Sequence, residues 1–475
     1  MNDQTPKAPN LKSAITRREF LGTSALATAA FTIVPRHVLG GPGYVAPSDK
    51  LNIACVGVGG QGRSDIANVG TENIVALCDV DDEQIARTIK HALEDTGKPD
   101  YADMLARATK YRDFRIMLET EPGIDAVTVT TPDHNHAVIA MAAIRLGKHV
   151  FVQKPLTQTV HEARALAKAA KEMKLVTQMG NQGHASEEAR LINEWIAAGA
   201  IGEVTEVHCW TNRPIWPQGV KFPQEIPSVP STLNWDVWIG PAPFRPYHPA
   251  YAPFSWRGWC DFGTGALGDM GAHIIDHPYW ALKLEYPDTV QASSTTFNSE
   301  TYPLASVVRF HFPARGKTAS VGMPAMEMTW YDGGLMPKRP EELEEGRLMG
   351  DQDGGVLYVG TKGKLMHGCY GKSPRLIPET KMKAFKLPPK TIPRSPGIHA
   401  EWIAAIKSGN GAQTTSNFEY AAKLTETMLL GNVAIRLAPK NTILKYDSEK
   451  MSFPNLPEAD QYLTRDYRPG WSLTG

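Results

Sequence analysis

The chain has few cysteines and no excess of either charge. It contains five cysteines, an odd number with no CxxC pair among them, which argues against both a disulfide framework and a zinc cluster. Lysine plus arginine number 50 and so do aspartate plus glutamate, so no overall field favours nucleic acid or an anionic membrane surface. We therefore expect a small-molecule ligand and no nucleic-acid partner.

The sequence also lacks an apolar run long enough to form a transmembrane helix. Its N-terminal stretch nevertheless differs from globular sequence, because Arg17 and Arg18 precede a short, weakly apolar segment of Ala, Thr, Ser and Leu. This pattern is similar to a twin-arginine (Tat) export signal, and the alternative is the start of an amphipathic helix. We expect residues 1–45 to be a signal and linker that meets the export machinery transiently, and the protein to be periplasmic or otherwise exported.

A glycine-rich turn follows the first apolar strand that the pattern predicts, residues 51–56. Gly57, Gly59 and Gly62 have GxGxxG spacing between that strand and a helix-like segment, the context in which the motif indicates dinucleotide binding. The first glycine permits a tight turn, the second lets a pyrophosphate approach the backbone, and the third allows close helix packing. The N–H groups at the helix start would bind the phosphates.

A second apolar strand ends at Asp79, about the distance beyond the glycines at which an acidic residue meets the adenosine ribose. A carboxylate there would accept hydrogen bonds from the ribose hydroxyls and repel a 2′-phosphate. NAD is therefore the expected cofactor and NADP is less favoured. The alternative is that Asp79 caps a helix or stabilises a turn.

Two further strand and helix units and one more strand follow, which predicts a parallel sheet with right-handed crossovers. Ligands bind beyond the carboxyl ends of such strands. Several polar residues and one proline lie at predicted strand ends, so we expect them to surround one crevice: Thr130, Pro132, His134, His136, Lys154 and Asn181. Lys154 could instead be a surface lysine, but the proline after it restricts it to extended geometry.

From about Glu203 the pattern changes to alternating runs that indicate an open, largely antiparallel sheet. A segment rich in proline and tryptophan lies between the first two of these strands, as expected for an ordered loop over a site. Most of its tryptophans should belong to local core. Arg213 and Trp259 are our candidate substrate contacts from this part of the chain.

The segment GALGDMGAHIIDH places Asp269 and His273 four residues apart, so that both side chains share a helix face. A carboxylate beside an imidazole supplies a hydrogen-bond acceptor and a group that titrates near neutral pH. Alternatively, Asp269 caps the helix and His273 packs against the sheet. We expect no metal, because the sequence has no HExxH and no convincing metal-ligand spacing.

In this order along one chain, these motifs resemble those of the Gfo/Idh/MocA superfamily of NAD(P)-dependent oxidoreductases. The resemblance rests on the glycines, on TPDHNHAVIAMAAIRLGKHVFVQKPL and on the Asp269 and His273 pair. It implies an α/β fold: a Rossmann domain with a doubly wound parallel sheet, then an α+β domain with an open, mostly antiparallel sheet. We place these domains at residues 46–182 and 183–440, with a C-terminal tail over residues 441–475.

The resemblance also implies roles for individual residues. His273 would take a proton from a substrate hydroxyl, Lys154 would stabilise the developing alkoxide, and Asp269 would fix a neighbouring hydroxyl. Substrate contacts are expected from Lys154, Asn181, Arg213, Trp259, Asp269 and His273. Cofactor contacts are expected from Gly57, Gly59, Gly60, Gln61, Gly62, Asp79, Thr130, Pro132, His136, Gln153, Lys154 and Asn181.

The usual Glu-Lys-Pro motif of that superfamily reads Gln153-Lys154-Pro155 here. An amide in place of the carboxylate removes a negative neighbour that would favour the charged form of the amine. We therefore expect Gln153 to tune Lys154 rather than to remove its role.

The resemblance and the export signal together predict an exported NAD-dependent oxidoreductase acting on a hydroxyl of a sugar, cyclitol or glycoside. Because soluble NAD is not replenished outside the cytoplasm, the cofactor should be tightly held and recycled within each turnover. One alternative is a redox-neutral glycosidase, which oxidises, eliminates, hydrates and reduces in turn. A second is a cofactor-bound sugar-binding protein without turnover. The resemblance also implies a homo-oligomer.

Overall fold

The computed structural model describes residues 49–318 and 321–473. The export signal that we predict over residues 1–45 lies outside the described residues. Within the described part, the helices fall short of the length and apolar content that crossing a membrane requires. The two large sheets of the structure lie in one unit of the chain, residues 51–475.

The first sheet has six strands, and every pair in it is parallel. Its strands are β1 (Asn52–Val56), β2 (Asn73–Cys78), β3 (Thr109–Tyr111), β4 (Ala126–Val129), β5 (His149–Val152) and β6 (Thr177–Met179). The central strands are short apolar runs and are buried, as strands covered by helices on both faces require. The order β3-β2-β1-β4-β5-β6 is that of a Rossmann sheet, with its topological switch between β1 and β4.

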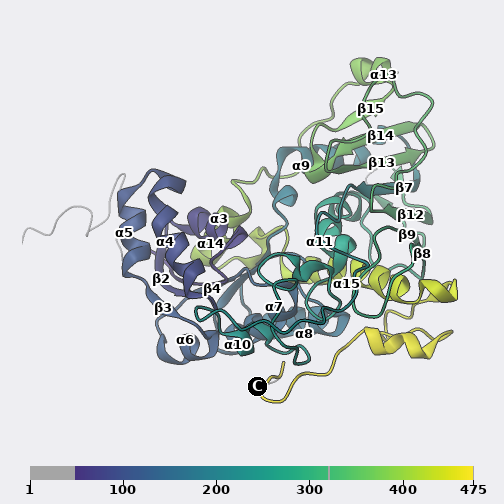
Figure 1. Cartoon of the computed structure of the whole chain (residues 1–475). Helices are drawn as coiled ribbons and strands as arrows, with labels where there is room; N and C mark the ends of the chain where they lie inside the picture. The colour runs from purple at the N-terminus through teal and green to yellow at the C-terminus, as the bar shows by residue number, and fades with distance from the viewer. Residues whose placement is uncertain (1–48, 319–320, 474–475) are drawn as a thin grey trace, which may run out of the picture. The chain divides into compact units, whose positions relative to one another are not determined.

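Helices cover both faces of this sheet (Figure 1). They are α3 (Gln61–Val69), α4 (Asp82–Thr96), α5 (Pro99–Arg107), α6 (Phe114–Thr120), α7 (Asp133–Arg145), α8 (Val160–Glu172) and, from far along the chain, α14 (Ile398–Ser408). α14 lies beside α3. Its Trp402 is fully buried, with its ring centroid 5.7 Å from that of Phe151 on β5. A late helix thus completes one face of the first sheet.

The second sheet has eight strands in the order β15-β14-β13-β7-β12-β9-β8-β16. They are β7 (Val204–Thr211), β8 (Thr289–Ser294), β9 (Ser306–Phe312), β12 (Met326–Tyr331), β13 (Gly354–Gly360), β14 (Gly363–Gly368), β15 (Arg375–Ile377) and β16 (Leu444–Lys445). Only the β7 and β12 pair is parallel. The predicted fold class, a parallel Rossmann sheet followed by a mostly antiparallel one, is confirmed.

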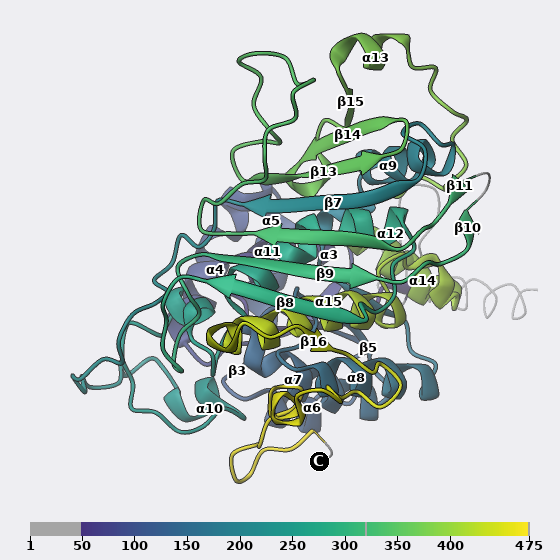
Figure 2. The same cartoon turned by 90° about the vertical axis from the view of Figure 1, so that its right-hand side faces the viewer.

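Figure 2 shows this second sheet with helices behind it. These are α9 (Glu187–Ala197), α11 (Gly265–Ile274), α12 (Asp276–Ala281) and α15 (Phe418–Arg436). Apolar side chains of α11 and α15 share a core with β8, β9 and β12. The remaining elements are β10 (Lys317–Thr318), β11 (Val321–Gly322), α10 (Trp235–Ile239), α13 (Glu379–Ala384) and the 3-10 turns η2 (Gln182–Ala185), η3 (Ser255–Gly258), η4 (Cys369–Gly371), η5 (Gly411–Gln413), η6 (Ala438–Lys440) and η7 (Pro457–Tyr462).

The proline- and tryptophan-rich segment returns from the second sheet to the first, and we call its residues 213–264 the strap. The Thr232 carbonyl accepts a hydrogen bond from the Asp82 N–H at 3.2 Å, and the Asn234 N–H donates to the Val80 carbonyl at 2.7 Å. These bonds hold the strap beside the end of β2. The expected ordered loop over a site is therefore present, and it is anchored by backbone hydrogen bonds.

The C-terminal tail holds the strap in turn. The Arg468 guanidinium donates to the carbonyls of Gly240, at 3.0 Å, and Asp236, at 2.9 Å. It also forms an ion pair with the Asp236 side chain, and the Arg468 N–H donates to the Pro241 carbonyl at 3.1 Å. The tail therefore fixes the C-terminal end of α10.

Candidate active site

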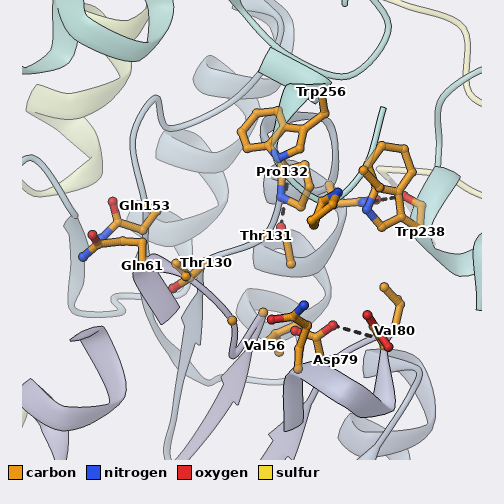
Figure 3. A pocket seen from close by; sticks show the side chains of 18 of the residues that line it. Val56, Gln61, Asp79, Val80, Thr130, Thr131, Pro132, Gln153, Trp238 and Trp256 are labelled. Carbon is orange, nitrogen blue, oxygen red and sulfur yellow. Dashed lines mark hydrogen bonds between the residues drawn. The ribbon is translucent and has the colours of Figure 1, made fainter. Parts of the chain in front are cut away.

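A cavity of about 850 Å³ lies at the carboxyl ends of the parallel strands. The strap and α11 form its other walls. Figure 3 shows Trp256 next to Pro132, Trp238 on one side, Gln61 and Gln153 on the other, and Asp79 beside Val80. This is the position at which an open parallel sheet binds ligands, next to the switch between β1 and β4.

The glycine turn is tightly packed under this cavity. Gly57 has a φ of +79°, and a Cβ there would lie 2.5 Å from the Thr130 carbonyl oxygen. A Cβ on Gly62 would lie 2.0 Å from the Gly57 carbonyl oxygen, whereas no atom of the described residues lies within 4 Å of one on Gly60. In the described part of the chain no side chain caps α3, and the first turn of this helix has no acidic residue. The turn therefore has the open space and the helix N-terminus that a pyrophosphate needs.

Asp79 stabilises the same turn. Its carboxylate accepts hydrogen bonds from the N–H groups of Val58, at 2.9 Å, and Asp81, at 3.0 Å. Burial raises the pKa of Asp79 to about 6, although these N–H donors favour the ionised form. The turn-stabilising alternative is thus observed. Asp79 also lines the cavity, and its contact with a ribose stays a prediction.

Lys154 and Asp269 form a partly buried ion pair in the cavity. The Lys154 Nζ donates to the Asp269 Oδ1 at 2.8 Å and to its carbonyl oxygen at 3.2 Å. Arg257 adds a second cation, with its Nε 3.3 Å from the same Oδ1. Burial opposes ionisation of Asp269, but Lys154 and Arg257 more than offset it and hold the pKa of Asp269 below its ordinary value. The site therefore contains a fixed carboxylate between two cations.

His273 lines the cavity one helical turn beyond Asp269, as the spacing predicts. It is 4% exposed, and its buried Nδ1 has no hydrogen-bond partner among the residues that the structure describes. The Tyr370 ring lies beside it, with centroids 4.6 Å apart. Burial and then the charge of Lys154 lower the pKa of His273 well below its ordinary value. The imidazole is therefore neutral near neutral pH and can accept a proton.

Sequence reasoning missed Asp133, which begins α7 and lines the cavity. Its Oδ2 accepts a hydrogen bond from the Thr264 hydroxyl at 2.6 Å. Burial raises the pKa of Asp133 to about 7, against the influence of Thr264 and Arg257. Asp133 directly follows Pro132, a residue predicted at a strand end. This place in the sequence was the signal that could have identified Asp133 as a site residue.

The strap supplies the other missed residues. Arg257 contacts Asp269, and the Arg257 guanidinium lies 4.3 Å from the Trp256 ring centroid and 5.1 Å from that of Phe254. Such stacking fixes a guanidinium that would otherwise be free to move. No local pattern marks these residues, because their approach to Asp269 depends on how the strap folds back.

Of the predicted contacts, eleven line this cavity: Gly57, Gly59, Gly60, Gln61, Asp79, Thr130, Pro132, Gln153, Lys154, Asp269 and His273. Gly62 lies beneath them against Gly57, which is the packing role that its place in the motif predicts. The cavity thus brings together residues from the glycine turn, three strand ends and α11.

Besides Gly62, four predicted contacts do not line this cavity. Both ring nitrogens of His136 lie 2.8 Å from backbone carbonyl oxygens, those of Pro155 and Thr131. Trp259 is buried in the aromatic core of the strap, where its Nε1 donates to the Ala250 carbonyl. Arg213 pairs with Asp353 at 3.2 Å. Asn181 is fully buried, and within residues 49–318 and 321–473 both polar atoms of its side chain are without a partner.

Asp133→Asn is expected to stabilise the protein at alkaline pH. Burial raises the pKa of Asp133 in the folded protein to about 7, so ionisation of this carboxyl group destabilises the fold. The destabilisation is absent below the unfolded-state pKa, grows as the pH rises, and is complete only above about pH 7. At ~1.4 kcal/mol per unit of pKa shift, the loss of unfolding free energy reaches a few kcal/mol. Unfolding free energies across this pH range should show a variant-minus-parent difference that grows with pH. Exposed Asp103→Asn is the control, and a difference independent of pH would contradict the prediction.

Two family models match the chain. Residues 51–181 match the NAD-binding Rossmann fold of the GFO_IDH_MocA oxidoreductase family, and residues 195–301 match its C-terminal alpha/beta domain. The glycine cradle described above fits that cofactor, because its close contacts exclude a Cβ at two positions and leave space at Gly60.

Among proteins of known name, levoglucosan dehydrogenase of Pseudarthrobacter phenanthrenivorans is 28% identical over 169 residues, 34% of each chain. A glycosyl hydrolase family 109 protein of Shewanella baltica is 29% identical over 210 residues, which cover 40% of this chain and 44% of that protein. The matched region therefore spans less than half the length of either relative.

Solved structures share the fold. A levoglucosan dehydrogenase in complex with NADH has a TM-score of 0.53 at 17% identity, over 83% of this chain and 98% of that one. The WlbA dehydrogenase from Bordetella pertussis, in complex with NADH and UDP-GlcNAcA, has a TM-score of 0.52 at 17% identity, over 84% and 99%. These structures show the shared fold, and the first family model identifies NAD as the cofactor of the first domain.

Proposed function

The chain belongs to the Gfo/Idh/MocA family of NAD-binding oxidoreductases, and from this premise we propose that it oxidises a hydroxyl of a sugar, cyclitol or glycoside. The observation that carries the proposal is the arrangement of Lys154, Asp269 and His273 in one buried cavity with the glycine turn. The names of two relatives, levoglucosan dehydrogenase and a glycosyl hydrolase, support a carbohydrate substrate.

Each side chain has a distinct part in this proposal. Bound NAD supplies the hydride acceptor. His273, neutral and without a partner at Nδ1, accepts the hydroxyl proton. The Lys154 ammonium stabilises negative charge on the substrate oxygen. Asp269, ionised between Lys154 and Arg257, orients the lysine and accepts a hydrogen bond from a neighbouring hydroxyl.

We also propose that the protein is exported and retains its cofactor through each cycle. The export signal is inferred from the Arg17 and Arg18 motif. Retention is supported by the strap, because Thr232, Leu233 and Trp238 line the cavity and the tail holds α10 through Arg468. A cofactor under such a closure leaves only when the strap moves.

Arg468→Ala is expected to raise the dissociation rate of NAD about tenfold, since losing charged hydrogen bonds of roughly 1.5–3 kcal/mol lets α10 detach more often. Stopped-flow release of bound NADH, followed by its fluorescence, would measure the rate. Arg394→Ala is the matched control, because Arg394 pairs with Glu187 and Glu194 but does not line the cavity. Equal release rates in both variants would show that the tail does not retain the cofactor.

A redox-neutral glycosidase is the second candidate function. That cycle needs a base for a carbon-bound proton and an acid for the leaving oxygen, in addition to the hydroxyl base. Asp133 supplies a second titratable group in the cavity with a pKa of about 7. The match to a glycosyl hydrolase family 109 protein also favours this candidate.

One experiment separates the candidates. The full chain is purified, its bound dinucleotide is identified by mass spectrometry, and sugars, cyclitols and glycosides are screened while NADH absorbance and free sugar are followed. Net NADH with an oxidised sugar supports the dehydrogenase, whereas glycoside cleavage with the bound cofactor still oxidised supports the glycosidase. Sugar binding without either change would support a binding protein and contradict both.

A further inference from the structure

A buried carboxylate lies directly behind the cavity wall. Asp65, on α3, is 0% exposed and does not line the cavity. Its Oδ2 accepts hydrogen bonds from Gln153 Nε2 and from the Thr130 hydroxyl, each at 2.9 Å. Its Oδ1 lies 3.1 Å from Gln61 Nε2 and 3.1 Å from His399 Nε2. Four side chains therefore converge on one buried anion.

These partners come from four separate elements or strand ends of the fold. Gln61 is in the first turn of α3, Thr130 follows β4, Gln153 follows β5, and His399 is on α14. Gln61, Thr130 and Gln153 line the cavity, and Figure 3 shows the three on the same side of it. The carboxylate thus links the glycine helix to two strand ends that face the cofactor.

The surroundings of Gln153 fix which way its amide points. Its Nε2 reaches both Asp65 oxygens, at 2.9 and 3.1 Å, while its Oε1 lies 3.4 Å from the Lys154 N–H. A Cβ on Gly180 would lie 2.6 Å from Nε2, so the amide is closely confined. A carboxylate can only accept hydrogen bonds, and burying one requires donors around it.

We propose that Asp65 is a positioning residue for the NAD site, and that position 153 carries an amide because the anion at this point is supplied from α3. Glutamate at position 153 would place two carboxylates about 3 Å apart, where they cannot both ionise. The Lys154 Nζ binds Asp269, whereas the Gln153 side chain binds Asp65, and an influence of Gln153 on the Lys154 amine stays a prediction.

Exchanging the carboxylate at position 65 with the amide at position 153 tests the proposal. Gln153→Glu and Asp65→Asn should each weaken NAD binding by about tenfold or more, because contacting residues couple by roughly 0.5–3 kcal/mol. The double variant restores one amide and one carboxylate with the roles exchanged, and its NAD affinity should recover to within about threefold of the parent. Calorimetric titration with NAD measures all four proteins and needs no substrate, so the result is independent of the proposed reaction.

The pH dependence gives a second measurement. In Gln153→Glu a proton shared between the two carboxylates provides a donor again, so its loss of NAD affinity should shrink at acidic pH and grow at alkaline pH. The double variant should lack this dependence. If general destabilisation caused the loss of NAD affinity, that loss would not depend on the protonation state of the side chains at positions 65 and 153.

Gln178→Glu is the matched control. Gln178 is equally buried, and its Nε2 donates to the Glu401 carboxylate at 3.1 Å, yet it does not line the cavity. This variant should lower the melting temperature without changing the NAD affinity of the folded protein. Additive losses in the double variant, or single variants that bind NAD like the parent, would overturn the proposal. If Gln153→Glu does not fold, a folded double variant supports the pairing and an unfolded one contradicts it.

Discussion

His273→Gln is expected to lower kcat/KM for hydroxyl oxidation by about 10²- to 10⁴-fold, the usual contribution of a positioned general base. Its buried Nδ1 has no hydrogen-bond partner in the described residues, so the substitution should cost little stability. NAD affinity should stay close to that of the parent. Steady-state kinetics with the sugar identified by the screen, and calorimetric titration with NAD, measure the two quantities.

The pH profile of the parent gives an independent check on this role. Burial and Lys154 lower the pKa of His273, so the base is unprotonated at neutral pH, and oxidation should fall only as the pH drops well below the ordinary histidine pKa. His277→Gln is the matched control, because His277 is also buried but does not line the cavity. If His273→Gln kept the parent rate, the proton would have to go to another group, with Asp133 the first to test.

Gly62→Ala is expected to abolish tight NAD binding, although alanine in a helix normally stabilises it by about 1 kcal/mol relative to glycine. The added Cβ would lie 2.0 Å from the Gly57 carbonyl oxygen, and backbone cannot yield as a flexible side chain can. Relieving this contact must move the turn, at a cost of about 1–3 kcal/mol in overpacked sites. We expect a lower unfolding free energy and a loss of NAD affinity of about 10- to 100-fold.

The control for Gly62→Ala is Ser64→Ala, at an exposed position on the same helix. It also changes helix propensity but adds no atom beneath the turn. Its NAD affinity should match that of the parent in calorimetric titration, and its stability should be equal or slightly higher. If Gly62→Ala bound NAD as tightly as the Ser64→Ala control, the glycine turn would tolerate a larger distance between position 62 and the Gly57 carbonyl oxygen, contrary to the prediction.

Local sequence patterns were enough to predict the fold and part of the candidate active site. The glycine spacing predicts the turn because that turn requires a positive φ at Gly57 and a close approach at Gly62, which few other residues permit. The four-residue spacing of Asp269 and His273 places both on the cavity side of α11, since a helix repeats every 3.6 residues. Apolar strands alternating with helices predict the parallel sheet in the same way.

Other predicted contacts failed to reach the cavity because residue type and strand-end position do not reveal which groups the surroundings already occupy. His136 meets backbone carbonyls on both sides of its ring, and Trp259 fills the core of the strap. Arg213 meets an acidic partner, Asp353, that lies 140 residues away in sequence. The partner of Arg213 in particular lies far outside any local window of the sequence.

The sequence by itself therefore determined the two-sheet fold, the NAD-binding turn and the helix that carries Asp269 and His273, because periods of two and 3.6 residues and the steric demands of glycine act over short stretches of chain. Only the tertiary structure decided that Arg257 joins Asp269, that Arg468 fixes the strap, and that Gln153 faces a buried Asp65. These outcomes depend on which charges and donors are buried together, and His399 reaches Asp65 across 334 residues of sequence.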